Sequence, residues 1–479
     1  MGATRLASEI STGALTASAA LDAHLDRIAR LNPDLNAVVQ LDADAARRRA
    51  DELDRALEEH GPVGPLHGVP VTVKDTFDVA GLRTTFGMRR YRSNRATHDA
   101  TAVARLREAG VVVMGKSNLA EMAFDWQSDN PVFGRTVNPW DRERTPGGSS
   151  GGGAAAVAAR LTPLELGGDG AGSLRVPAHF CGVATIKPTE HLVPGRGHLA
   201  VPGGTRADRW SIAAGPLARS MADLRVALGV IVGPDGRSPD VPPVPLGSID
   251  RGAVGGRRVV WTDELPGLPV TADTRRTLET LAERLSAAGW SVERITPDLD
   301  VADALLTSGR IMGTQLGVNI PRAFRLPFRF RFGRRYGHGP WVDGVVDGLR
   351  MRADTLLRAL DRRDEHVDGV DRILGDADGW LLPVASVPAF THRATGTPLE
   401  VDGHEVPYSL GAGGYATILN LTGHPVVVFP AGASTDDLPI GAQLVGRRWG
   451  DAALLDTAEA IEALDGPEAH RWSVTRLEG

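Results

Sequence analysis

The first sixty residues carry apolar side chains at helical spacing. Those between Leu21 and Leu31 recur every three or four residues, which predicts an amphipathic helix over about 15–31. Thr16 can cap its first turn, and the Asn-Pro pair at 32–33 is expected to end it. A second, more polar helix is expected before residue 60, with its charged face turned to solvent.

From that second helix onward, short buried strands alternate with helices. The run at 69–73 (VPVTV) predicts a strand that leads into Lys74 and Asp75. Helices are predicted at about 43–59, 99–109, 151–160, 221–231, 272–289 and 451–463, and strands or strand-like apolar stretches at 111–114, 161–166, 257–261, 290–295, 426–429 and 440–445. This alternation is typical of the α/β class and predicts a single large domain with a mixed β-sheet core covered by helices.

Composition and charge exclude several classes of protein. The 479 residues hold 53 Lys and Arg against 59 Asp and Glu, a net charge of −6, so bulk charge does not attract nucleic acid. Cys181 is the only cysteine, which excludes an intrachain disulfide and a cysteine metal cage. No apolar run approaches the roughly 20 residues of a membrane span, and no secretory signal is evident. We expect a cytoplasmic monomer or homodimer with no nucleic-acid partner and no membrane span.

Some segments match binding motifs only superficially. Residues 110–117 (GVVVMGKS) satisfy the phosphate-loop pattern, but their apolar middle must itself be a strand. The glycines at 195 and 197 resemble a dinucleotide fingerprint still more weakly. The segment 322–335 interleaves six arginines with four phenylalanines, which is compatible with a membrane-surface or anionic-ligand patch. We favour a surface loop or helix pair over the core, with arginines reaching solvent. The histidines show no paired spacing, so no metal site is expected.

Candidate chemistry lies in three segments of the first half. Lys74 follows a buried strand, so desolvation should lower the pKa of its ammonium and make a neutral amine available as a base. A salt bridge to a carboxylate such as Asp75 is the alternative. The segments 147–152 (GGSSGG) and 167–177 (GGDGAGSLRVP) offer accessible hydroxyls and backbone N–H groups that can converge on an oxyanion. Each segment alone is equally compatible with simple turns.

Together, the three segments closely resemble the amidase signature family. The stretch 147–189, which reads GGSSGGGAAAVAARLTPLELGGDGAGSLRVPAHFCGVATIKPT, is similar to the family's serine- and glycine-rich signature. Similar blocks stand at 64–81, 115–124, 214–224, 419–432 and 438–446. The resemblance implies the amidase signature fold over the single domain 1–479, divided into a helical segment at 1–60, a core with the site at 64–232, a variable substrate-side region at 235–380 and a completing part at 381–479.

By this resemblance, the site is a triad of two serines and a lysine. Ser173 would be the nucleophile, Ser149, after a cis peptide bond, the proton shuttle, and Lys74 the final base, with no metal or organic cofactor. The remaining expected roles are an oxyanion hole of the N–H groups of Gly170, Ala171, Gly172 and Ser173, an ion pair of Asp169 and Arg175 that braces the loop, and hydrogen bonds around the triad from Ser150. The expected pocket residues are Phe124, Trp126, Gln127 and Val176, joined by aromatic residues of 324–341 if that segment folds over the cleft.

The chain departs from the family pattern at a few positions. Ala171 stands where the family usually has Gly, Gly168 where Thr or Ser is common, and Ala184 where Gly is usual. The segment after residue 189 also diverges. None of these departures removes a triad member, so they bear on substrate range and leave activity intact.

The resemblance implies hydrolysis of a carbon–nitrogen bond through an acyl-serine. The expected substrate is a small or bulky apolar or aromatic amide or anilide, with ester cleavage as a side activity. Carbamate hydrolysis on the same triad is the alternative. A tRNA-dependent amidotransferase subunit is less favoured, because such subunits typically carry Gln after the signature Arg, where this chain has Val176. A non-catalytic binding protein on the same scaffold conflicts with the intact triad.

Overall fold

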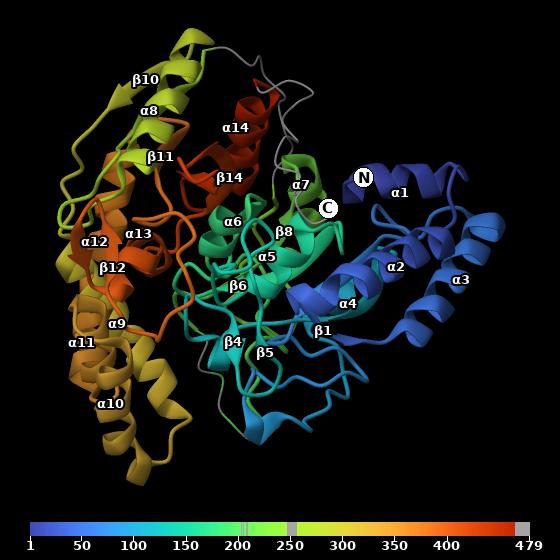
Figure 1. Ribbon diagram of the computed structural model, residues 1–479, viewed down its shortest axis with the longest axis horizontal. Coiled ribbons are helices and arrows are strands. Elements are labelled where there is room, and N and C mark those ends of the chain that lie inside the picture. Colours follow the sequence, from blue (N-terminus) through green and yellow to red (C-terminus); the bar gives the residue numbers. More distant parts are fainter. Residues whose placement is uncertain (203, 205, 207–208, 247–255, 465–479) are drawn as a thin grey trace.

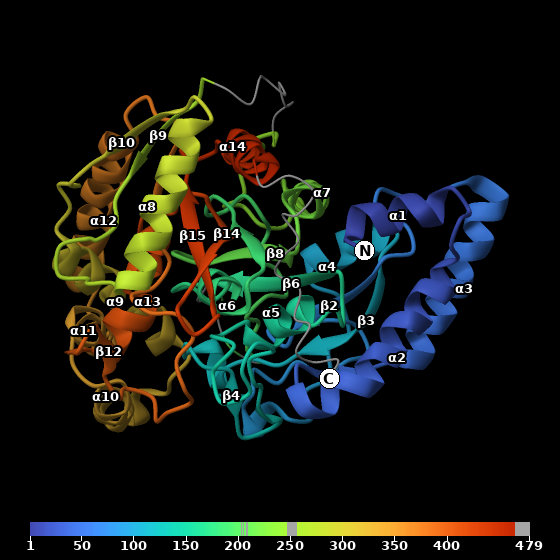
Figure 2. The same cartoon turned by 45° about the horizontal axis from the view of Figure 1, so that its top comes forward.

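One long mixed sheet organises the molecule (Figures 1 and 2). The computed structural model describes residues 1–202, 204, 206, 209–246 and 256–464. Within these residues, eleven strands form the sheet in the order β1-β3-β2-β6-β8-β7-β14-β15-β11-β9-β10. Their bounds are β1 Val38–Leu41, β2 Pro70–Lys74, β3 Val112–Ser117, β6 Leu164–Asp169, β7 Ala184–Lys187, β8 Ala213–Ala218, β9 Arg258–Trp261, β10 Ser291–Arg294, β11 Gly379–Pro383, β14 Val426–Ala433 and β15 Pro439–Val445. Two hairpins lie apart from it, β4 (Asp129–Asn130) with β5 (Gly134–Arg135) and β12 (Leu399–Val401) with β13 (His404–Val406).

Strand direction decides where the functional segments meet. β2 is parallel to both of its neighbours, β3 and β6, with Val73 level with Leu166. The carboxyl ends of β2 and β6 therefore reach the same edge, which brings Lys74 beside the glycines that follow Leu166. β6 and β8 are antiparallel, as are β7, β14 and β15 with their neighbours, so the sheet is mixed.

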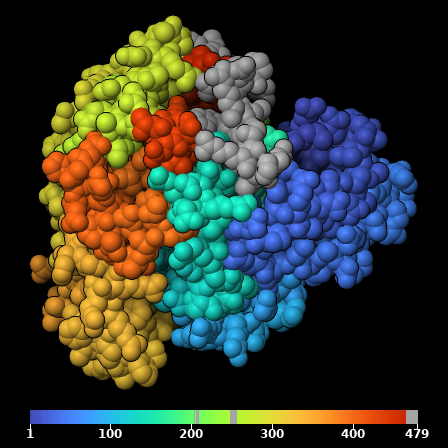
Figure 3. All heavy atoms as spheres, viewed as in Figure 1, coloured from blue at the N-terminus to red at the C-terminus, as the bar shows by residue number. Residues whose placement is uncertain are grey.

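Helices cover both faces of the sheet. One apolar core contains buried side chains of α2, α5, α6, α9, α12 and α13, and the other contains those of α4, α7, α8 and α14. The helices are α1 Ala3–Ser11, α2 Ala17–Leu35, α3 Ala43–His60, α4 Thr101–Glu108, α5 Gly151–Ala158, α6 Arg175–Cys181, α7 Met221–Ile231, α8 Ala272–Ala287, α9 Val301–Val318, α10 Arg322–Tyr336, α11 Pro340–Gly348, α12 Ala353–Leu374, α13 Tyr408–Leu421 and α14 Asp451–Ala463, with short 3-10 turns η1 Arg89–Tyr91 and η2 Glu121–Ala123. Figure 3 shows the N-terminal helices at one end of the molecule and the segment that holds α10 and α11 at the other.

The α/β prediction is confirmed, and most predicted elements lie within a few residues of the observed ones. The segment 110–117 contains β3, so its apolar middle is a strand rather than a phosphate loop. The predicted end of the helix at 15–31 is wrong. α2 runs through Pro33 to Leu35 and stops at Asn36, whose backbone is left-handed at φ 51°. Leu35 is fully buried, so core packing extends the helix by half a turn past the proline.

The segment rich in arginine and phenylalanine forms the single helix α10, not a loop or a helix pair. Phe332 is buried, whereas Phe324 and Phe330 are exposed. In the part of the chain that the structure describes, no helix is both long and apolar enough to cross a membrane. The same residues contain no cluster of three or more His, Cys, Asp and Glu side chains that could hold a metal ion.

Candidate active site

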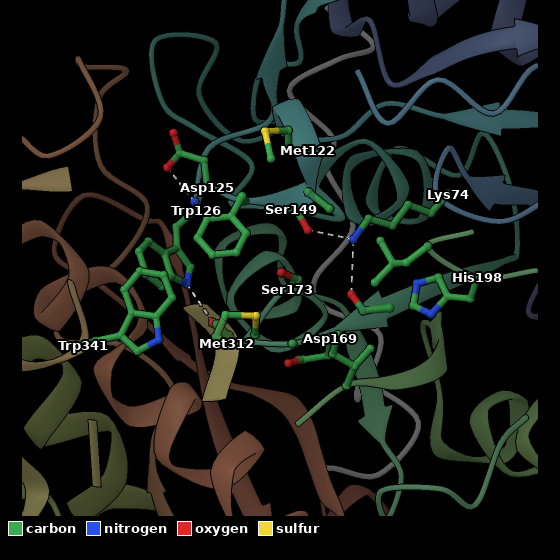
Figure 4. Close-up of a pocket in the computed structure, with 17 residues that line it drawn as sticks. Lys74, Met122, Asp125, Trp126, Ser149, Asp169, Ser173, His198, Met312 and Trp341 are labelled. Carbon is green, nitrogen blue, oxygen red and sulfur yellow. Dashed lines mark hydrogen bonds between the residues drawn. The ribbon is translucent and has the colours of Figure 1, made fainter. Parts of the chain in front are cut away.

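Lys74 ends β2 on the face of the sheet that α5 covers. Val71 and Val73 point into the core on the opposite face. Because successive side chains of a strand point to opposite faces of the sheet, Lys74 points toward α5. Its side chain is 1% exposed. Nζ donates to Ser149 Oγ at 2.8 Å and to the carbonyl oxygen of Gly168 at 3.2 Å (Figure 4). Among the described residues, the amine is hydrogen-bonded to one hydroxyl and one carbonyl oxygen and forms no ion pair with a carboxylate.

Burial sets the protonation of this lysine. Desolvation lowers the pKa of Lys74 to about 7, against the opposing effect of the negative charges of Asp169 and Glu165. A neutral amine is therefore accessible near neutral pH, as the sequence predicted. The alternative of a salt bridge to Asp75 is wrong, because Asp75 Oδ1 pairs with Lys116 Nζ at 3.1 Å.

Ser149 and Ser150 stand at the start of α5. The peptide bond between Gly148 and Ser149 is cis, in agreement with the resemblance. A Cβ on Gly148 would lie 2.3 Å from the carbonyl oxygen of Asp125, so only glycine fits there. Ser150 N donates to the carbonyl oxygen of Ser173 at 3.1 Å, and its Oγ donates to that of Gly168 at 3.3 Å. Ser150 therefore ties the loop that carries Ser173 to the end of β6, around the residues expected to form the triad.

The loop from Asp169 to Arg175 is held by a buried ion pair between its two ends, with Arg175 Nη2 3.0 Å from Asp169 Oδ1. One expected role in this loop is wrong. Gly172 N donates to Asp169 Oδ1 at 2.8 Å and to Asn420 Oδ1 at 3.0 Å, so this amide does not face the cleft. Among the described residues, nothing accepts a hydrogen bond from the backbone amides of Gly170, Ala171 and Ser173, and these three residues line the cleft. They remain the candidates for binding an oxyanion.

The cleft has a volume of about 600 Å³, counting the part open to solvent. Lys74, Ser149 and Ser173 form its polar end. Its apolar wall is formed by Phe124, Trp126, Ile212, Met312 and Trp341. Figure 4 shows Ser173 between the lysine side and the tryptophan side of this cleft. The hydrogen bonds of the described residues include none from Ser173 Oγ, so the two serine hydroxyls are not linked in this state.

Aromatic rings pack against one another in the apolar wall. The rings of Phe124 and Trp341 stack with centroids 5.6 Å apart, and Trp126 meets Trp341 edge to face at 5.3 Å. Trp126 Nε1 also donates to the carbonyl oxygen of Ala171 at 2.8 Å. The wall is thereby attached to the loop that precedes Ser173, so pocket shape and loop geometry are coupled.

Two expected pocket residues do not line this cleft. Gln127 donates to the carbonyl oxygen of Arg393 at 3.0 Å and to Tyr408 Oη at 3.2 Å, and it borders a neighbouring polar hollow. Val176 is completely buried in α6 behind the loop. Phe124 and Trp126 are in the cleft as expected.

The expectation that aromatic residues of 324–341 cover the cleft holds for Trp341, whereas Phe324 and Phe330 are exposed and do not line it. Other cleft residues were not singled out in the sequence. Met312 and Ile212 have no local signal, because their place depends on how α9 and the start of β8 pack. His198 lies in the divergent segment after residue 189, where no motif marks it.

Comparison with known proteins agrees with this architecture. The family model Amidase matches residues 19–322 and 334–455, leaving out only part of α10 within that span. The chain is 32% identical to the acylamidase of Rhodococcus erythropolis, covering 97% of this chain and 95% of that one. It is 33% identical to the indoleacetamide hydrolase of Bradyrhizobium diazoefficiens, covering 97% and 86%.

A third relative has a different role. It is a glutamyl-tRNA(Gln) amidotransferase subunit of Acidobacterium capsulatum, 32% identical, with 95% of this chain and 97% of that one covered. Among solved structures, 6-aminohexanoate cyclic dimer hydrolase in complex with substrate superposes with a TM-score of 0.81 at 27% identity, covering 100% and 99% of the two chains.

The fold and these relatives define an amide-cleaving hydrolase. The chain belongs to the amidase family, that of the amidase signature enzymes.

Proposed function

We propose that this enzyme hydrolyses the carbon–nitrogen bond of a small apolar or aromatic amide through a covalent acyl-enzyme on Ser173. The observation that carries the proposal is the 2.8 Å hydrogen bond from the buried Lys74 amine to Ser149 Oγ, in the same cleft as Ser173. A lysine near its own pKa at neutral pH is a competent general base.

The reaction begins with a proton relay. Neutral Lys74 takes the proton of Ser149, Ser149 takes that of Ser173, and Ser173 Oγ forms a bond to the substrate carbonyl carbon. Because the described residues include no hydrogen bond between Ser173 Oγ and Ser149 Oγ, Ser173 Oγ must turn toward Ser149 when substrate binds. Such tightening is common between a free enzyme and its substrate complex.

Collapse of the tetrahedral intermediate breaks the carbon–nitrogen bond. The oxyanion is bound by the free amides of the loop, from Gly170, Ala171 and Ser173, each of which contributes about 3 kcal/mol in comparable sites. The proton on Lys74 returns through Ser149 to the leaving amine. Water, deprotonated by the same relay, then attacks the acyl carbon, and the acid leaves as Ser173 regains its proton.

The apolar wall supports an aromatic or bulky apolar substrate. Phe124, Trp126 and Trp341 contribute aromatic rings to the lining of the cleft, and Met312 adds a flexible apolar side chain. Figure 4 shows the two tryptophans across Ser173 from Lys74. Two relatives that share the family are an acylamidase and an indoleacetamide hydrolase. An anilide or an arylacetamide fits a wall of this kind.

A carbamate is the second candidate substrate class, because the same oxyanion site serves an amide, an ester and a carbamate carbonyl. A panel of aryl amides, aliphatic amides and aryl carbamates, assayed with wild type and Ser173→Ala, tests both. We expect the aryl amides to be cleaved fastest. If the carbamates were cleaved faster, they would replace the amides as the first candidate substrate class. Equal rates for wild type and Ser173→Ala would contradict the proposed nucleophile.

An amidotransferase role has less support. The apolar cleft does not match the polar side chain of glutamine, and Val176 stands where amidotransferase subunits typically carry Gln. Glutamine therefore belongs in the panel, with ammonia release as the readout. We expect no release above background.

A further inference from the structure

The imidazole of His198 occupies the space beside Gly168 into which a side chain at position 168 would extend. A Cβ on Gly168 would lie 2.5 Å from His198 Nε2, closer than ordinary contact allows. The ring stacks flat on Phe77, with 4.0 Å between centroids and 10° between planes. A backbone bridge also pairs Phe77 with His198. Two departures from the family pattern are thus spatially related: His198, from the divergent segment after residue 189, fills the space that glycine at position 168 leaves free.

His198 also borders the lysine. His198 and Lys74 line the same cleft, and Lys74 Nζ donates to the carbonyl oxygen of Gly168, the residue against which the ring packs. Figure 4 shows the ring on the lysine side of the cleft, away from the tryptophans. Burial and the charge of Lys74 lower the pKa of His198 to about 3. The ring is therefore neutral near pH 7 and covers this side of the cleft without adding charge.

We propose that His198 is a positioning residue that keeps water away from Lys74 and so favours its neutral amine, using the space that Gly168 leaves free. This inference rests on the proposed role of Lys74 as the base. The carboxyl groups of Glu165 and Asp169, both on β6, favour the charged ammonium. Lys116 is engaged by Asp75. Because the two β6 carboxylates oppose neutralisation, the amine depends on exclusion of water, and His198 supplies part of that cover.

The pH dependence of nucleophile reactivity tests this role without a known substrate. The rate at which an alkyl fluorophosphonate modifies Ser173 is measured against pH in wild type, His198→Ala and His198→Phe. In wild type, we expect the rate to rise with a midpoint near pH 7. In His198→Ala, water reaches the amine and the midpoint should move up by about half a pH unit or more. In His198→Phe, a ring still stacks on Phe77 and the midpoint should stay near that of wild type.

A rescue separates this role from simple loss of packing. Gly168→Ser alone should lower the melting temperature, since its side chain meets the ring. Gly168→Ser combined with His198→Ala should return the midpoint toward wild type, because the new side chain fills the vacated space. A midpoint in His198→Ala equal to that of wild type would overturn the inference. A double variant whose midpoint lies as far above that of wild type as the midpoint of His198→Ala would overturn it too. If Ser173→Ala reacts with the probe as fast as wild type, the proposed function fails instead.

Discussion

Asp169 and Arg175 are joined at two points in the interior of the protein. Arg175 Nε lies 3.0 Å from Asp169 Oδ2, and Nη2 lies 3.0 Å from Oδ1. The same carboxylate accepts the backbone N–H groups of Gly172 and Leu174, so it shapes the loop that presents Ser173. Burial acts against its charge, but the Arg175 guanidinium and these hydrogen bonds hold the pKa of Asp169 well below its usual range.

Asp169→Asn will destabilise the protein strongly. It leaves the buried Arg175 without its counter-charge, which costs about 3–5 kcal/mol in comparable buried pairs. Since the folded-state pKa of Asp169 is lowered, its stabilisation is present above the unfolded pKa and is lost only as pH falls through the folded value. The free energy of unfolding, measured by denaturant titration at pH 7, should fall accordingly. The control is Asp22→Asn, which removes an exposed ion pair with Arg47. This variant should change the free energy of unfolding by less than about 1 kcal/mol. Equal effects of the two variants would contradict the bracing role.

Ser173→Ala will remove hydrolysis of every substrate in the panel. Loss of the nucleophile in a serine hydrolase costs on the order of 10⁴-fold or more in kcat. Because the side chain makes no hydrogen bond within the described residues, the melting temperature should stay within a few degrees. Ser291→Ala, at an exposed position on the edge strand β10, is the matched control and should retain full activity. Substantial activity in Ser173→Ala would place the nucleophile elsewhere.

Lys74 should set the acid limb of the pH–rate profile. Only its neutral form accepts a proton, so kcat/KM should rise as pH increases through about 7 and then level off. The measurement is kcat/KM between pH 5.5 and 9 for the fastest substrate of the panel. A profile that is flat through this range would show that the rate does not depend on the ionisation of this lysine.

Lys74→Met should abolish activity and yet not lower stability. The folded pKa of Lys74 lies below the unfolded value, so the unfolded state binds more protons and stability rises with pH between about 7 and 10.5. The penalty of burying the amine is therefore complete below pH 7. An apolar chain of similar length removes this penalty, and at pH 6 we expect the free energy of unfolding to rise by roughly 1–3 kcal/mol. A clear loss of stability at pH 6 would indicate that the amine stabilises the fold.

Trp341→Ala should reduce the preference for aryl over aliphatic amides. The ring stacks on Phe124 in the apolar wall, and its Nε1 has no hydrogen-bond partner among the described residues, so the substitution removes surface and no polar contact. We expect the ratio of kcat/KM for aryl and aliphatic amides to fall by about tenfold, the effect of one lost aromatic contact. Trp449→Ala, outside the cleft, should leave the ratio unchanged. An unchanged ratio in Trp341→Ala would remove this wall from the substrate site.

Much of this protein was predictable because the relevant patterns are local. Helical spacing, short buried strands and turn residues place most elements within a few residues of their observed bounds. Lys74 could be named as a candidate because it directly follows a run of apolar strand residues, and Ser149 and Ser173 because a glycine precedes each of them within one continuous stretch of signature. The local pattern predicted the wrong end for α2, because the burial of Leu35 in the core extends this helix past Pro33.

The sequence by itself determined the alternation of strands and helices and the presence of a lysine and two serines in the signature pattern, since each depends on neighbours along the chain. Only the tertiary structure decided which other residues surround the lysine and the two serines. The amide of Gly172 is withdrawn from the cleft by Asn420, which lies 248 residues away along the chain. Trp341 and Met312 become part of the wall, and His198 fills the space over Gly168. These relationships join residues far apart in the chain, so they arise from packing, which no local pattern encodes.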